Sequence, residues 1–220
     1  MESNFRATAG CLYVSFQNPS HQRGKFHEKT ACFFTLIIAS TLLVGCLIPE
    51  RFSAKLDIQP DAGYTFRYSG TVVHALAAGQ IKKAGSLSEK DENSLKSEVE
   101  KMSKSPEVKK VAYKGDGRYE LELEAVRKAG QPLSMFSIFS VNTDKNGVMT
   151  IASKEVDEKG KRELEQLGIT INGTFEVYIP KNVDIIFQNA TSTPTFGFGS
   201  YSWDIGRIDQ RPMMKIKFKP

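Results

Sequence analysis

The chain has 220 residues, of which 40% are hydrophobic and 25% charged, so it can bury a core and is not expected to be disordered. Its formal net charge is +5. Removal of residues 1–46, which hold four of the 30 basic and two of the 25 acidic residues, would leave +3. Because this excess is small and the basic residues alternate with acidic ones, as in residues 89–110, we expect no nucleic-acid partner.

The first notable segment is an apolar run over residues 31–44, ACFFTLIIASTLLV, which contains no charge, Gly or Pro. As a helix it would rise only about 21 Å, against about 30 Å for the hydrocarbon core of a bilayer. Arg23, Lys25 and Lys29 precede it, and a basic segment before a short apolar one is typical of a secretory signal. We therefore expect residues 1–45 to be a signal peptide, although the long basic region leaves its true start open.

The run ends in Leu43-Val44-Gly45-Cys46, which resembles the lipobox of bacterial lipoproteins. In that family a diacylglyceryl group is attached to the Cys thiol and a peptidase cuts before the Cys, so the preceding residue has to be small, as Gly45 is. The resemblance implies cleavage between Gly45 and Cys46, lipidation of Cys46, and membrane lipid as a partner. Two or three acyl chains hold a protein durably at a bilayer, whereas one holds it marginally.

Two other interpretations of the run stay open, namely a core helix that ends in a buried cysteine and an uncleaved anchor without lipid. Cleavage would remove Cys11 and Cys32, so the mature chain would contain neither a disulfide nor a cysteine metal ligand. Leu47, rather than Asp, follows the cysteine, which by resemblance to Gram-negative lipoproteins permits passage to the outer membrane. We expect a lipid-anchored protein of the cell envelope that faces the periplasm or the exterior.

We expect residues 46–55 to be a lipidated cysteine and a tether, because Pro49 discourages a helix, and residues 56–220 to form a single domain. Apolar periodicity and turn signals then predict the following elements. They are strands at 54–59 and 64–73, helices at 74–85 and after Ser88, hairpins turning at 115–117 and 146–147, a helix from Asp157 to Gly168, strands at 169–179 and 183–188, and a final strand pair at 201–206 and 213–219. Consecutive hairpins indicate an α+β fold, with a mostly antiparallel sheet of short strands and about three helices packed on one side.

Catalytic and metal-binding patterns are absent from the part of the sequence that would remain after cleavage. It holds one histidine, His74, and no cysteine other than Cys46, so a multi-His or Cys metal site is not expected. Glu120, Glu122 and Glu124 alternate with Tyr119, Leu121 and Leu123, which is typical of a solvated strand face. We expect no cofactor, no metal and no enzymatic activity.

The most unusual stretch is TPTFGFGSYSW at residues 193–203, where Phe196, Phe198, Tyr201 and Trp203 alternate with small residues. One interpretation is a binding surface for an apolar ligand, a glycan or an envelope protein. The other is a loop entering a strand whose rings fill the core, with Trp203 plugging the sheet.

The segments LGITINGTFEVYIPKNVDIIFQNAT (167–191) and YSWDIGRIDQRPMMKIKF (201–218) resemble a family of uncharacterised bacterial lipoproteins similar to the LppM-type domain. The resemblance implies a membrane-tethered domain with lipid-binding ability, and no binding residue is carried over. We interpret the chain as a non-catalytic binding or scaffold module of the envelope. An envelope hydrolase acting on lipid or cell-wall material and an interaction subunit of an envelope complex stay open as alternatives.

Overall fold

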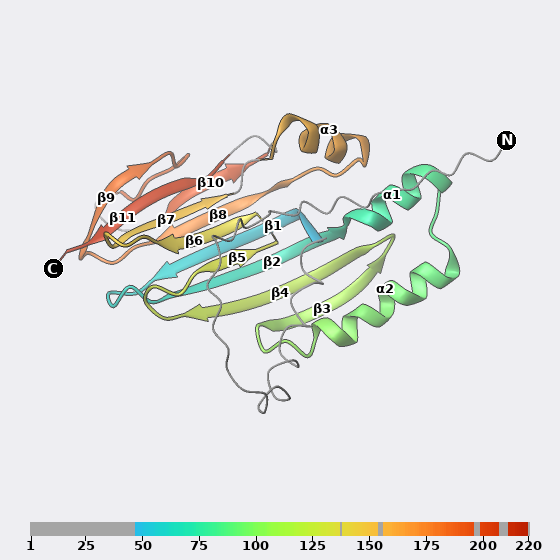
Figure 1. Ribbon diagram of the computed structural model, residues 1–220, viewed down its shortest axis with the longest axis horizontal. Coiled ribbons are helices and arrows are strands. Elements are labelled where there is room, and N and C mark those ends of the chain that lie inside the picture. The colour runs from blue at the N-terminus through green and yellow to red at the C-terminus, as the bar shows by residue number, and fades with distance from the viewer. Residues whose placement is uncertain (1–46, 137, 154–155, 196–198, 207–210, 220) are drawn as a thin grey trace, which may run out of the picture.

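The computed structural model describes residues 47–136, 138–153, 156–195, 199–206 and 211–219. The fold is α+β, as the sequence predicts, with about half of the described residues in strands. In chain order the elements are β1 (Leu47–Ile58), β2 (Tyr64–His74), α1 (Ala75–Ala84), α2 (Glu89–Met102), β3 (Val108–Gly115), β4 (Arg118–Arg127), β5 (Leu133–Met135), β6 (Phe139–Thr143), β7 (Val148–Ser153), α3 (Glu158–Gln166), β8 (Asn172–Tyr178), β9 (Val183–Gln188), β10 (Tyr201–Ile205) and β11 (Met213–Phe218), as labelled in Figure 1.

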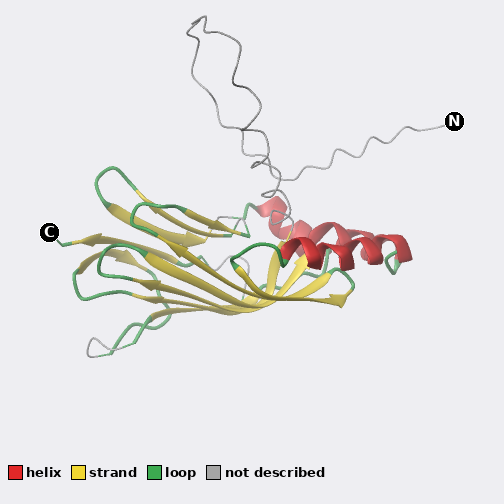
Figure 2. Ribbon diagram, turned by 90° about the horizontal axis from the view of Figure 1, so that it is seen from below, coloured by secondary structure: helices red, strands yellow, loops and turns green. Residues whose placement is uncertain are grey.

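The strands form two sheets rather than one. The large sheet has the order β10-β8-β1-β2-β4-β3 and the small sheet the order β5-β6-β7-β11-β9. Neighbouring strands are antiparallel except β1 and β8, which run parallel from Arg51 beside Asn172 to Asp57 beside Tyr178. Figure 2 shows the helices and the small sheet on the same side of the large sheet. We call the covered side of the large sheet its inner face and the other side its outer face.

Alternation along the strands assigns each side chain to one of these faces. In β4 the burial pattern alternates so that Tyr119, Leu121 and Leu123 are buried, whereas the intervening glutamates are partly exposed, which confirms the predicted solvated face. In β2 the rings of Tyr64, Phe66 and Tyr68 are all buried on one side. The period-two pattern in the sequence therefore predicts both faces of these strands correctly.

Aromatic rings fill the space between the two sheets. The ring of Phe139 in the small sheet lies 5.6 Å from those of Phe52 and Phe66, and 5.2 Å from that of Phe175, centroid to centroid. Phe52 lies opposite two glycines, Gly70 of β2 and Gly173 of β8. A Cβ atom added to Gly173 would lie 2.5 Å from the Phe52 carbonyl oxygen, so only glycine leaves room for that strand.

The helices begin and end at the residues that the sequence indicates. Ser88 and Asp157 cap α2 and α3, since their side-chain oxygens accept from the backbone N–H groups of Asp91 and Gly160. Gly85 ends α1 in the left-handed conformation with φ 82° and donates its N–H to the Ile81 carbonyl. These local signals fix the ends of helices even though little of α3 is buried.

The predicted tether over residues 46–55 is wrong from Leu47 onward. Leu47 opens β1 and is buried, and β1 lies between β2 and β8 in the large sheet. Pro49 does not prevent this, because the ladder shifts register between Pro49 and Arg51 and pairing with β8 starts only at Arg51. A proline is tolerated at such a bulge, because no hydrogen bond to a neighbouring strand needs its missing backbone N–H.

The predicted pairing of the last two strands is also wrong. β10 pairs with β8 at the edge of the large sheet, whereas β11 lies between β7 and β9 in the small sheet. The strands are not all short either, since β1 and β2 have 12 and 11 residues. The chain changes sheet after each of β8, β9 and β10, so these neighbours in sequence are not neighbours in the ladder.

Candidate functional site

The predicted lipobox, Leu43 to Cys46, and the predicted signal peptide over residues 1–45 lie outside the described residues. The structure does place the next residue, Leu47, which is 3% exposed and pairs with His74 at the end of β2. Within the described ranges, every helix is too short or too polar to span a bilayer. The lipidation and cleavage at Cys46 stay predictions, and the structure describes the chain from Leu47 onward.

The aromatic stretch before and within β10 does not form an exposed surface at Trp203. Its ring is 4% exposed, stacks on Phe175 at 5.6 Å, and donates Nε1–H to the Asn189 Oδ1 at 2.9 Å. Tyr201 is half-buried, and Phe196 and Phe198 lie outside the described residues. Trp203 thus belongs to the core, so including it in a binding surface is wrong.

The single histidine of the body caps a helix. The backbone N–H of Ala77 donates to Nδ1 of His74 at 3.3 Å, at the point where β2 passes into α1. This nitrogen serves as the acceptor that a first helical turn requires. No three His, Cys, Asp or Glu side chains gather as a metal site in the part of the chain that the structure describes.

Carboxylates and amines form a charge ladder on the outer face. Glu120 lies 2.9 Å from both Lys110 and Lys114, and hydrogen bonds from these two amines lower its pKa to about 2. Glu124 pairs in the same way with Arg67 at 2.8 Å and with Lys109 at 3.8 Å. Both carboxylates thus have fixed cationic partners, which is typical of a solvated, neutralised surface.

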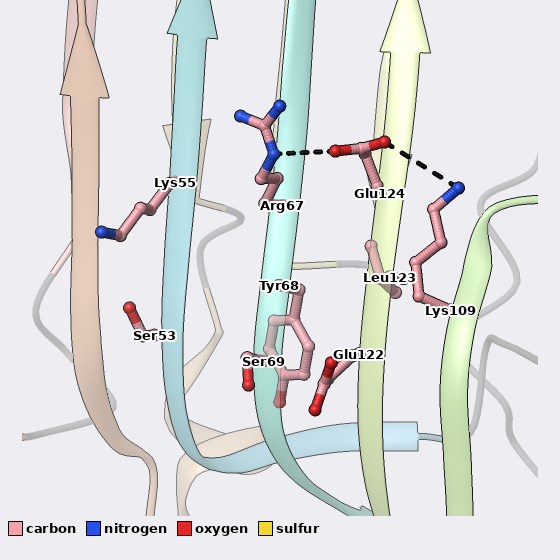
Figure 3. A pocket seen from close by; sticks show the side chains of 9 residues that line it. All are labelled: Ser53, Lys55, Arg67, Tyr68, Ser69, Lys109, Glu122, Leu123 and Glu124. Carbon is pink, nitrogen blue, oxygen red and sulfur yellow. Dashed lines mark hydrogen bonds and ion pairs between the residues drawn. The ribbon is translucent and has the colours of Figure 1, made fainter.

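A shallow depression of about 300 Å³ lies on the outer face between β1, β2, β4 and β3 (Figure 3). Its lining includes Ser53 and Ser69, whose hydroxyls could bond a polar group, and Lys55, whose amine turns away toward β8 and pairs with Glu176 at 3.3 Å. The remaining lining residues are Arg67, Tyr68, Lys109, Glu122, Leu123 and Glu124. Because its cations already contact carboxylates, the depression offers hydroxyls and aliphatic stems more than net charge.

An apolar surface lies on β9, the last strand of the small sheet. Ile185, Ile186 and Phe187 are 40%, 54% and 45% exposed, on both sides of the strand. Sequence reasoning predicts the strand but not its exposure, because a continuous apolar run normally indicates burial. Only the position at the sheet edge explains it, and an exposed apolar edge strand can pair with another strand.

No protein-family model and no curated protein matches the chain. Among solved structures, the folded domain of LppM from Mycobacterium tuberculosis, determined by NMR, is similar with 11% sequence identity and a TM-score of 0.34. The match covers 78% of this chain and 92% of that domain. A similarity of this size does not carry function from one chain to the other.

Proposed function

We propose that this protein is a lipid-anchored lipoprotein of the cell envelope, whose body is a non-catalytic binding or scaffold module. The observation that supports this most is that the described residues from Leu47 on form a packed core by themselves. Cleavage before Cys46 would therefore remove none of the described strands, helices or core residues.

The environment of the polar groups supports a role without catalysis. His74 is engaged in capping α1, and the glutamates of β4 face solvent beside lysine and arginine partners. A hydrolase would need an acid or base poised near neutral pH in a cleft. The outer-face depression, with its two hydroxyls, is a more suitable place for a bound polar group than for a reaction.

The proposal is tested by expressing the full chain in a bacterium with lipoprotein-processing enzymes. We expect the protein to be recovered in the membrane fraction, with mass spectrometry showing an N-terminal, acylated Cys46. Cys46→Ser should release the body or leave an uncleaved precursor, whereas the matched control Cys32→Ser should behave as the unchanged protein. An unmodified Cys46 on a chain that stays in the membrane would support the uncleaved anchor instead.

The exposed edge of β9 favours a second function, as an interaction subunit that offers this strand to an envelope protein. A strand added to this edge would cover Ile186, at the centre of the apolar run. In that case Ile186→Lys should shift the detergent-extracted protein from a larger assembly to the size of a single chain. Val126→Lys, at a 66% exposed position on the outer face, is the control and should cause no shift.

A further inference from the structure

The start of β1 is held rigidly in the large sheet. Leu47 pairs with His74, and Glu50, which is 9% exposed, accepts hydrogen bonds from Arg118 Nε at 2.9 Å and Nη2 at 3.0 Å. Ile48 packs in a small apolar cluster with Val73, Ala78, Leu164, Leu167 and Ile169, which joins α1 to the end of α3. A membrane anchor attached to this strand would have no flexible spacer on the body side.

Covalent geometry limits how far helix α1 can lie from such an anchor. Consecutive Cα atoms are about 3.8 Å apart and paired antiparallel residues about 5.5 Å. The path from Cys46 through Leu47 and His74 to Leu76 therefore spans at most about 17 Å. If acyl chains on Cys46 enter a bilayer, the first turn of α1 can lie no farther than about 17 Å from the point where they enter, which is close enough for α1 to reach the headgroup layer.

The outward face of α1 has the composition that a bilayer surface favours. Leu76 is 57% exposed, and Gln80 and Lys83 follow it at the i+4 and i+7 positions of the same helix face. Lys82 and Lys83 lie in the last turn of α1, which contains no acidic residue, whereas α2 and α3 contain several. On such a helix the leucine side chain can insert among the lipid headgroups, and the lysine amines can contact their phosphates.

We propose that α1 docks on the surface of a bilayer that contains anionic phospholipid, with Leu76 inserted among the headgroups and Lys82 and Lys83 on their phosphates. This inference rests on the proposed lipid anchor at Cys46. It adds an orientation: the body lies against the membrane through α1, and the edge strand β9, at the opposite end of the molecule in Figure 1, points away from α1.

The test uses the acylated protein, reconstituted in vesicles of phosphatidylglycerol and phosphatidylethanolamine. The body has no cysteine after Cys46, so Leu76→Cys introduces a single reactive thiol for an environment-sensitive fluorophore. We expect its emission to shift to the blue and to be quenched by lipids that carry a nitroxide near the headgroup. Ile186→Cys on β9 is the matched control, exposed to a similar degree, and should stay as in water.

Two further outcomes separate this inference from the anchor itself. Replacing both Lys82 and Lys83 by Gln should reduce the docking equilibrium constant in anionic vesicles roughly 25-fold, since each lysine contributes about fivefold. In zwitterionic vesicles the reduction should be far smaller. Acylated protein whose Leu76→Cys probe stays in water, or whose Ile186→Cys probe is quenched instead, would overturn the docking alone. Protein that carries no acyl chain would overturn the anchor and, with it, the docking.

Discussion

The inner and outer faces of the large sheet are built from the same strands and differ in how they are packed. On the inner face, rings such as Phe52 and Phe175 lie against the small sheet with almost no exposed area. On the outer face, ion pairs such as Lys110 with Glu120 lie in solvent, with half of the lysine side chain exposed. Because packed apolar contacts outweigh exposed ion pairs, the inner face should carry the stability and the outer face should tolerate change.

The sharpest test of this contrast uses two neighbouring residues of β2, one on each face. A Cβ atom added to Gly70, on the inner face, would lie 2.6 Å from the backbone Cα of Phe52, which cannot move without moving β1. We expect Gly70→Ala to lower the free energy of unfolding by about 3 kcal/mol or more. Ser69→Ala, on the exposed outer face, should change it by less than about 0.5 kcal/mol. Urea denaturation measures both, and equal effects would contradict the contrast.

Trp203 tests whether the inner face extends to the sheet edge at β10. Its indole N–H and the Met213 backbone N–H both donate to Asn189 Oδ1, so this one oxygen links the large and small sheets. Trp203→Phe should cost about 1–2 kcal/mol, through the lost hydrogen bond and a small cavity. As Trp203 is the only tryptophan, its emission reports this site directly and should resist quenching by iodide. Rapid quenching would place the ring in solvent and restore the binding-surface interpretation.

High pH should weaken the inner face through its buried phenols. Burial raises the pKa of Tyr64 to about 12, although Arg127 nearby lowers it, and the hydroxyl donates to the Gln131 carbonyl at 2.6 Å. An unfolded chain releases this proton near pH 10, so the stabilisation is complete below about pH 10 and is lost as the pH rises towards about 12.

The variant Tyr64→Phe isolates this contribution. It should be less stable than the unchanged protein by about 1 kcal/mol near pH 8, because it lacks the hydrogen bond to Gln131. Near pH 11 the difference should shrink by about 1 kcal/mol, because the variant has one phenol fewer to ionise on unfolding. Denaturant titrations at the two pH values measure this change, and a difference that does not vary with pH would contradict the assignment.

The part of the fold that the sequence predicts correctly is the part with local causes. The caps at Ser88 and Asp157, the turn at Gly147 and the alternation in β4 each depend on residues a few positions apart. Partners in the ladder depend on distant segments instead. That is why the parallel pairing of β1 with β8 and the separation of β10 from β11 could not be read from either strand alone.

The candidate site divides in the same way. The predicted lipobox is a contiguous motif, so the sequence alone can suggest it without any knowledge of the fold. The exposure of Ile186 follows only from the edge position of β9. The strand that starts at Leu47 is not predicted, because Pro49 argues against regular structure there and is tolerated only through a bulge in the pairing with β2. The helix predicted at 74–85 includes His74, but the capping role of this side chain follows only from the position of α1.

The smallest change in stability is expected for a substitution of Glu120 on the outer face. Lys110 and Lys114 lower the pKa of Glu120 to about 2. The small stabilisation by its ion pairs is therefore complete above the ordinary glutamate pKa and is lost as the pH falls from there towards about 2. Both lysines are half exposed, so solvent and salt screen these pairs. Glu120→Gln should therefore leave the melting temperature unchanged in about 1 M salt, where the Debye length is about 3 Å, and lower it only slightly at low salt. A loss that persists at high salt and equals that of Trp203→Phe would mean that the outer face is packed against something, and the depression beside Ser53 and Ser69 would then be the first place to seek that contact.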